Sequence, residues 1–233
     1  ADRIAEAIEF EGPDTVAAVF LEPVQNSGGC FPPPPGYFER VREICDRHDV
    51  IMVSDEVICA YGRLGHMFGA ERYGYQPDII TSAKGLTSGY SPLGAMVASD
   101  RLFEPFNDGK TTFGHGYTFG GHPVCCAAGM AAMQGLLDEK MIQDVKKKEE
   151  LFRSLLFHPK IKTVRSFGLW MALEFDSFET NKKVIDYCIE NGVLTDWFLF
   201  ASNCLRIVPP LTISRQDIEL ACRKIISILN RLS

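Results

Sequence analysis

Three short apolar segments in the first half of the chain each end on a charged side chain. They run from Val16 to Glu22, from Val50 to Asp55 and from Asp78 to Lys84. Continuous apolar runs of this length are typical of strands that are buried on both faces of a parallel sheet. Parallel strands end at one edge of their sheet, and ligands bind beyond that edge. We therefore expect Glu22, Asp55 and Lys84 to belong to a functional site.

The residues between these segments have the pattern of helices and loops. Residues 36–48 carry apolar side chains at the spacing of an amphipathic helix, namely Phe38, Val41, Ile44 and Cys45. Residues 94–99 form a fourth short apolar run. Strands that alternate with helices predict an α/β domain with a mostly parallel sheet, which we place at residues 1–145.

The sequence changes character after His122. Residues 124–137 and 141–157 have the composition of helices, and shorter strands and helices follow from 163 to 232. Ser214 and Asp217 are spaced as residues that cap the start of the last helix. We expect a small C-terminal α+β domain at residues 146–233.

Composition and charge exclude several classes of protein. The 233 residues include 24 Lys and Arg against 30 Asp and Glu, which disfavours nucleic-acid binding because phosphate contacts need a basic face. No apolar run approaches the roughly 20 residues that cross a bilayer, so we expect no membrane partner. The chain begins without Met in a helix-like stretch, so we expect a piece of a longer protein.

The eight cysteines favour a reducing compartment, and we expect a cytoplasmic protein. They lie within helix-like and strand-like segments, and Cys125 and Cys126 are adjacent. The sequence contains no Cys-x-x-Cys pair and no Cys/His spacing typical of a metal site. We therefore expect free, buried thiols and no metal.

Lys84 closes an apolar run and is followed by Gly85 and a polar stretch, an unusual place for a cation. Desolvation favours the neutral form of an amine, and a held neutral amine is the form that attacks an aldehyde carbon. Lys84 is therefore a candidate for Schiff-base formation. A surface lysine on the loop after a strand is an equally good interpretation of this segment alone.

Asp55 lies 29 positions before Lys84, one strand–helix–strand unit away. A buried carboxylate needs a cationic or hydrogen-bonding partner. A protonated pyridine nitrogen would serve, since Asp55 would then keep the ring able to accept electrons. Two other roles stay open, which are capping of the following segment and metal ligation. No second acidic or histidine ligand stands at a suitable spacing for a metal.

Five motifs stand in a fixed order along the chain. They are residues 19–25 (VFLEPVQ), 54–58 (SDEVI), 82–85 (SAKG), 117–123 (YTFGGHP) and 205–211 (LRIVPPL). The same motifs occur in this order in the class III aminotransferases, which the chain resembles over essentially its whole length. The resemblance implies the fold of aspartate aminotransferase, with a three-layer large domain, the cofactor pyridoxal 5′-phosphate (PLP) and a homodimer. It also implies that the family's N-terminal half, with its phosphate-binding segment, is missing.

The resemblance assigns roles to single residues. Lys84 resembles the lysine that forms the Schiff base with PLP and moves a proton, and Asp55 resembles the partner of the pyridine nitrogen. Val57 matches the apolar side chain that packs against the ring. Thr118 matches a threonine that reaches the cofactor phosphate of the neighbouring subunit, which implies shared active sites.

Glu22 and Arg206 match a pair that recognises substrate. In the branch that acts on ornithine, acetylornithine and 4-aminobutyrate, an arginine three residues before Pro-Pro binds the α-carboxylate of glutamate or 2-oxoglutarate. Arg206 stands at that position, and Glu22 matches the glutamate that pairs with this arginine when an ω-amine is bound. A guanidinium grips a carboxylate in a two-pronged way. A structural salt bridge or a solvent-facing arginine is the alternative interpretation.

These features predict a PLP-dependent aminotransferase. It moves an amino group from an ω-amine or amino acid to a keto acid such as 2-oxoglutarate or pyruvate. Two alternatives stay open. The chain by itself is a non-catalytic fragment, or the protein is a PLP-dependent decarboxylase or aminomutase of the same family.

Overall fold

The computed structural model describes residues 1–232, which form two compact units. The first unit consists of Ala1–Pro23, Pro33–Tyr61 and Phe68–Asp138. The second consists of Val24–Pro32, Gly62–Met67 and the chain from Glu139 onward. Two short segments of the N-terminal part therefore belong to the second unit, although their neighbours in the sequence lie in the first.

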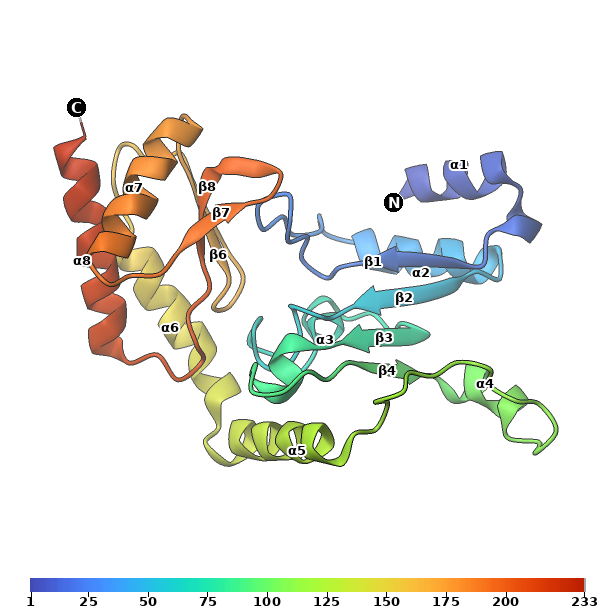
Figure 1. Ribbon diagram of the computed structural model, residues 1–233. Coiled ribbons are helices and arrows are strands. Elements are labelled where there is room, and N and C mark those ends of the chain that lie inside the picture. The colour runs from blue at the N-terminus through green and yellow to red at the C-terminus, as the bar shows by residue number, and fades with distance from the viewer. Residues whose placement is uncertain (233) are drawn as a thin grey trace. The chain divides into compact units, whose positions relative to one another are not determined.

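A four-stranded sheet forms the centre of the first unit (Figure 1). Its strands follow the order of the chain and are β1 (Ala18–Leu21), β2 (Ile51–Asp55), β3 (Ile79–Ser82) and β4 (Ala95–Ala98). The first three strands are parallel, and β4 is antiparallel to β3. This topology confirms the predicted α/β unit with a mostly parallel sheet.

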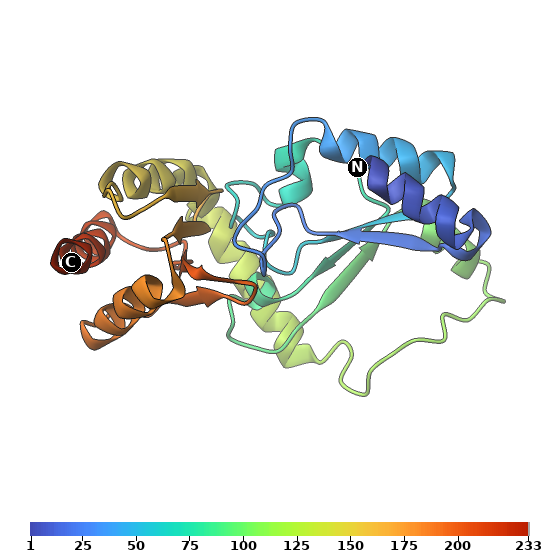
Figure 2. The same cartoon turned by 90° about the horizontal axis from the view of Figure 1, so that it is seen from above.

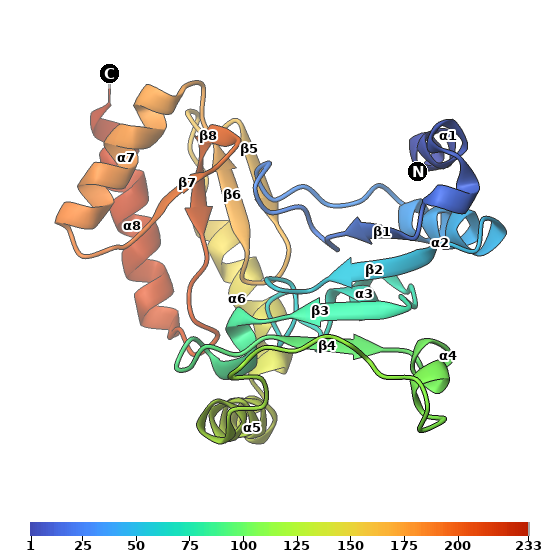
Figure 3. The ribbon, with the colours of Figure 1, turned by 45° about the vertical axis from the view of Figure 1, so that its right-hand side comes forward.

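Helices α1 (Asp2–Glu11) and α2 (Tyr37–Arg47) lie side by side in the first unit (Figure 3). All four apolar side chains that were expected on one face of α2 are buried. One of them, Phe38, stacks on the ring of Tyr75 with the ring centroids 4.0 Å apart. Full burial of a large apolar side chain contributes roughly 1.5–3 kcal/mol. The amphipathic spacing therefore places the face of α2 that packs on the core.

The remaining elements of the first unit connect and extend the strands. They are η1 (Pro13–Thr15), α3 (Gly69–Tyr73), η2 (Lys84–Thr87), α4 (Asp100–Phe103), η3 (Glu104–Phe106) and α5 (Pro123–Asp138). Helix α5 packs against the 3-10 turn η2 at Gly129. A β-carbon at Gly129 would lie 3.0 Å from Leu93 Cδ2 and 3.5 Å from the carbonyl oxygen of Leu86. The glycine therefore lets α5 lie close to the turn that begins at Lys84.

The second unit contains an antiparallel sheet and three helices (Figure 2). Across the sheet the strands are β5 (Thr163–Ser166), β6 (Met171–Glu174), β8 (Ala201–Ile207) and β7 (Asp196–Phe198). Helices α6 (Met141–Leu155), α7 (Phe178–Glu190) and α8 (Arg215–Arg231) share one apolar core with β6 and β8. Strand β7 is missing from the sequence-based expectations because three residues are too few to show the alternation of a strand.

Two serine side chains cap helices of the second unit. The Ser214 hydroxyl accepts the Asp217 N–H at 3.1 Å, and it donates to the Asp217 carboxylate at 2.7 Å. The Ser177 hydroxyl accepts the Thr180 N–H at the start of α7, also at 3.1 Å. The cap that the spacing of Ser214 and Asp217 predicts is therefore confirmed.

Asp78 joins three elements of the first unit. Its Oδ2 accepts hydrogen bonds from the Met52 N–H of β2 and from Arg42 Nη1 of α2, each at 2.8 Å. Its Oδ1 accepts one from Arg101 Nη2 of α4 at 2.9 Å. Burial by itself would raise the pKa of the Asp78 carboxyl, but the Met52 amide and the two guanidinium groups hold this pKa below its usual value.

We expect Asp78→Asn to lower the free energy of unfolding by about 2 kcal/mol at neutral pH, since hydrogen bonds to a charged partner contribute roughly 1.5–3 kcal/mol. The folded-state pKa of Asp78 lies below the unfolded-state value. Its stabilisation is therefore present above the unfolded-state pKa and is lost as the pH falls through the folded-state pKa. Urea unfolding at about pH 7 and about pH 3 measures this. A difference between the two proteins that stays constant with pH would contradict the expectation.

Candidate functional site

The carboxyl ends of β1, β2 and β3 meet at one edge of the sheet in the first unit (Figure 1). Glu22 follows β1 directly, Asp55 is the last residue of β2, and Lys84 comes two residues after β3. The register of the parallel strands sets Asp55 beside Thr81. The sheet therefore gathers the three charged positions at the edge where ligands of parallel sheets bind.

The Asp55 carboxylate is oriented by the backbone that follows it. Its Oδ1 accepts the N–H of Val57 at 3.0 Å, and the Asp55 side chain is half-buried. The contact is a local turn of the kind that aspartate forms two residues ahead. Capping of the following segment, one of the roles left open by the sequence, is thus part of what Asp55 does. The hydrogen bond from the Val57 N–H also fixes the direction of the Asp55 carboxylate.

Lys84 stands at the start of η2 with a backbone φ of +39°, in the left-handed region. This region costs an ordinary L-residue about 1–2 kcal/mol, and such strain persists only where the surroundings determine it. The Lys84 side chain is exposed in the described chain. Residues 1–232 therefore do not bury the Lys84 amine as the sequence suggested. They leave the amine accessible.

Glu56 is a buried carboxylate that the sequence reasoning missed. Its oxygens accept the N–H of Gly69 at 2.8 Å, the N–H of Ala70 at 2.7 Å and the hydroxyl of Ser54 at 3.3 Å. Burial raises the pKa of this carboxyl, and the two backbone hydrogen bonds act against the rise. Glu56 thereby anchors the segment after Asp55 to the start of α3. The signal in the sequence was a second acid directly after the strand-ending one.

Val57 and Thr118, the other two expected cofactor contacts, lie in different surroundings. Val57 is half-buried next to the edge of the sheet. Thr118 is exposed in the irregular segment between η3 and α5. Their predicted contacts with a cofactor stay predictions.

Arg206 lies on β8 in the second unit and is paired with an acid on the neighbouring strand. Its Nη2 is 2.5 Å from Asp196 Oδ2, and the two residues stand opposite each other in the register of β7 and β8. The guanidinium stays partly exposed, with 37% of the side chain accessible. The salt bridge that the sequence left open therefore exists, although with Asp196. The exchange of partners between Glu22 and a substrate stays a prediction.

A comparison with known protein families identifies the family of this chain. Residues 1–229 match the family model described as aminotransferase class-III. The chain belongs to the class III aminotransferases. The five motifs quoted above therefore identify the family correctly from the sequence.

Individual class III relatives agree in sequence and in fold. A protein of Mycobacterium tuberculosis named as a probable aminotransferase is 63% identical over 187 residues, which cover 78% of this chain and 40% of that protein. The omega-amino acid–pyruvate aminotransferase of Pseudomonas putida is 35% identical and covers 100% of this chain and 54% of its own length. A solved transaminase from a marine Virgibacillus has a TM-score of 0.90 at 33% identity and covers 99% of this chain and 57% of that one. This class III chain thus spans about half the length of these relatives.

Among residues 1–232 the eight cysteines form no disulfide, and six of them are buried. Burial raises the pKa of Cys188 to about 11 and that of Cys222 to about 12, which keeps these thiols protonated and unreactive. Among residues 1–232, no group of three His, Cys, Asp or Glu side chains is placed to hold a metal ion. Within the same residues, no helix is both long and apolar enough to span a membrane.

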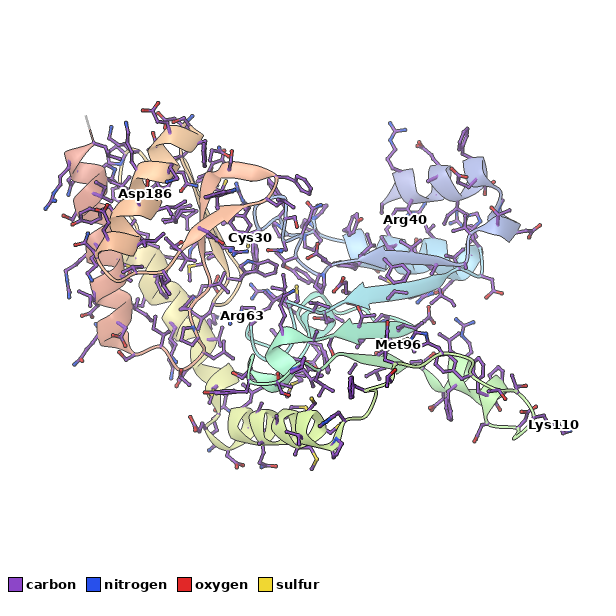
Figure 4. The ribbon with its side chains drawn as sticks, viewed as in Figure 1. Cys30, Arg40, Arg63, Met96, Lys110 and Asp186 are labelled. Carbon is purple, nitrogen blue, oxygen red and sulfur yellow. The ribbon has the colours of Figure 1, made fainter. Side chains whose placement is uncertain are left out.

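Arg63 joins two backbone segments of the second unit (Figure 4). Its Nη1 donates to the carbonyl oxygens of Leu169 at 2.8 Å and Pro209 at 2.6 Å. Burial lowers the pKa of the guanidinium to about 10. The Arg63 carbonyl in turn accepts the Leu169 N–H at 3.0 Å. Gly168 has a φ of +67°, and a β-carbon there would stand 2.3 Å from the Arg63 carbonyl oxygen, so only glycine fits.

We expect Gly168→Ala to lower the free energy of unfolding by roughly 2–4 kcal/mol, because it adds both backbone strain and a clash. A matched control is Gly135→Ala, since Gly135 lies within α5 with no atom within 4 Å of an added β-carbon. That change should stabilise by about 0.5–1 kcal/mol. Denaturant unfolding of both variants measures the effects. Equal effects would mean that the turn at Gly168 is more yielding than the geometry indicates.

Proposed function

We propose that this chain is the part of a PLP-dependent aminotransferase that supplies the lysine and the acid of the cofactor site. The single observation that carries the proposal is the pairing of β2 with β3 in a chain of the class III family. This pairing sets Asp55 and an exposed, strained Lys84 at one edge of the sheet. The function is shared with residues that lie beyond this chain in its longer relatives.

The side chains at this edge fit PLP. The Lys84 amine is accessible, the Asp55 carboxylate is oriented by the Val57 N–H, and Val57 offers an apolar surface. PLP, when bound, supplies an aldehyde that joins amines and a pyridinium ring that accepts an electron pair. Asp55 would hold the pyridine nitrogen and keep it protonated, while Val57 would pack on one face of the ring.

Lys84 would perform two tasks in turn. Its Nζ would be the amine that holds the cofactor at its aldehyde carbon. The same amine would hold and move a proton at Cα of the amino donor, as a general base and then as a general acid. The exposure of Lys84 suits both tasks, because Nζ would have to move between the cofactor and Cα of the donor.

The substrates that we propose are an ω-amine or amino acid donor and a keto acid acceptor such as 2-oxoglutarate or pyruvate. The names of relatives support both acceptors, since the Pseudomonas putida protein is named for pyruvate and a Halomonas elongata transaminase for 2-oxoglutarate. Arg206 is the group that we propose for the substrate carboxylate. Asp196 would then share or release the guanidinium that it now holds.

For the assembly, we propose a homodimer in which Thr118 reaches the cofactor phosphate of the partner subunit. Tyr117 and Phe119 on either side of Thr118 are 79% and 78% exposed, which suits a segment that packs on another chain. We further propose a three-layer large domain at residues 1–145, a small α+β domain at 146–233 and a cytoplasmic location. The proposal of a cytoplasmic location rests on the buried, protonated thiols.

The first test is chemical trapping of the bond to Lys84. The protein is incubated with PLP and reduced with borohydride, and peptide mass spectrometry locates the modified lysine. We expect a stoichiometric adduct on Lys84 in the wild type and a matching visible absorption band. Both should be lost in Lys84→Ala and kept in Lys110→Ala, which changes a lysine at the exposed tip of the loop after η3 (Figure 4). Modification spread over surface lysines would refute the cofactor role of Lys84.

The second test separates the carboxylate site from the cofactor site. Arg206→Ala should raise the KM for 2-oxoglutarate by roughly 10- to 100-fold, because it removes a charged hydrogen-bond partner. The KM for a monoamine donor, which has no carboxylate, should stay within about twofold. The control Asp196→Asn keeps Arg206 and should leave 2-oxoglutarate binding intact. Equal effects of R206A on both substrates would rule out the proposed role of Arg206.

A further inference from the structure

One tyrosine contacts the chain on both sides of Lys84. The hydroxyl of Tyr61 lies 2.9 Å from the hydroxyl of Ser82, two residues before the lysine. Its side chain also covers Gly85, the residue after the lysine. A β-carbon at Gly85 would lie 3.3 Å from Cδ2 and 3.4 Å from Cβ of Tyr61. Tyr61 therefore brackets the backbone of Lys84.

The backbone of Lys84 needs support from outside. Its φ of +39° follows Ala83 at a φ of −160° and a ψ of −143°. A non-glycine residue leaves such a conformation unless its surroundings determine it. Because the Lys84 side chain is exposed, its own packing does not hold the backbone. The residues on either side hold the backbone of Lys84 in place, since Ser82 and Leu86 are only 4% and 6% exposed.

Tyr61 is itself fixed in place. Its backbone has a φ of +55°, and its ring packs against Phe68 with the centroids 5.9 Å apart. The short segment that ends at Tyr61 begins at Asp55 and contains the buried Glu56, which is bonded to the start of α3. The residue that brackets Lys84 is therefore connected, through the five residues 56–60, to the proposed partner of the pyridine nitrogen.

We propose that Tyr61 is a positioning residue that sets the direction of the Lys84 side chain relative to Asp55. This inference rests on the proposed cofactor role of Lys84. The hydroxyl contact holds Ser82 at the end of β3, and the tyrosine ring holds Gly85. Because the residues on both sides are held, the backbone of Lys84 keeps its conformation, and this sets the direction of its side chain. Phenylalanine at this position would keep the ring but lose the contact with Ser82.

The first experiment needs no cofactor. Tyr61→Phe and Ser82→Ala should each speed amide hydrogen exchange in the peptide of residues 82–90 by roughly three- to tenfold, the effect of losing one hydrogen bond. A matched control is Tyr75→Phe, which removes a similar hydroxyl contact of 2.7 Å to Ser54 in the same unit. That variant should leave exchange in residues 82–90 unchanged. Unchanged exchange in a folded Y61F protein would overturn the proposal.

The second experiment follows the visible band of PLP bound to Lys84 as a function of pH. Y61F and S82A should move the midpoint of this titration by the same amount, and the double variant should move it no further, because all three lose one contact. Y75F should titrate as the wild type even where its melting temperature falls as far as that of Y61F. A wild-type midpoint in both Y61F and S82A would show that Tyr61 packs on Gly85 without positioning Lys84.

The two proposals fail in different ways. A wild-type protein with no band dependent on Lys84 would refute the cofactor role and, with it, the positioning of a catalytic lysine. A band that is present but insensitive to Tyr61→Phe and Ser82→Ala would refute only the role of Tyr61. If Y61F does not fold, S82A removes the same hydroxyl contact from the other side and decides the question.

Discussion

The parallel pairing of β2 with β3 is the interaction on which the candidate site depends. The register sets Asp55 beside Thr81, so an acid and a lysine that are 29 positions apart in the chain end at one edge of the sheet. Three consecutive residues of β2 are buried, so apolar alternation does not select the register. A side-chain contact that favours this register is the hydrogen bond from the Met52 N–H to the Asp78 carboxylate, at 2.8 Å.

Backbone strain gathers around the same edge. Tyr61, Lys84 and Ser88 all have positive φ, at a cost of about 1–2 kcal/mol each. Close to these positions, Glu56 is buried and Tyr61 packs on Gly85. Strained positions persist only where the surrounding structure determines them, and they cluster at functional sites. The packing around the edge is therefore part of the proposed function of Lys84.

Arginines in the second unit hold loops that come from the first half of the chain. Arg165 donates to the Gly29 carbonyl at 2.7 Å and to Glu174 at 2.6 Å, and its guanidinium lies 4.6 Å from the centre of the Phe31 ring. Arg63 holds the segment Gly62–Met67 in the same unit. Neither loop has a periodic pattern, so the sequence contains no local signal for the unit to which each belongs.

The sequence by itself determined the strand that ends on Asp55, the strand that lies just before Lys84, the buried face of α2, the cap at Ser214 and the family. Each of these follows from side-chain periods along one element or from short motifs. Tertiary structure alone decided that β4 runs antiparallel, that Glu56 is buried, that Arg206 pairs with Asp196 and that Lys84 is exposed and strained. The physical reason is that burial, ion pairing and strain arise between segments far apart in the chain, which a local pattern does not record.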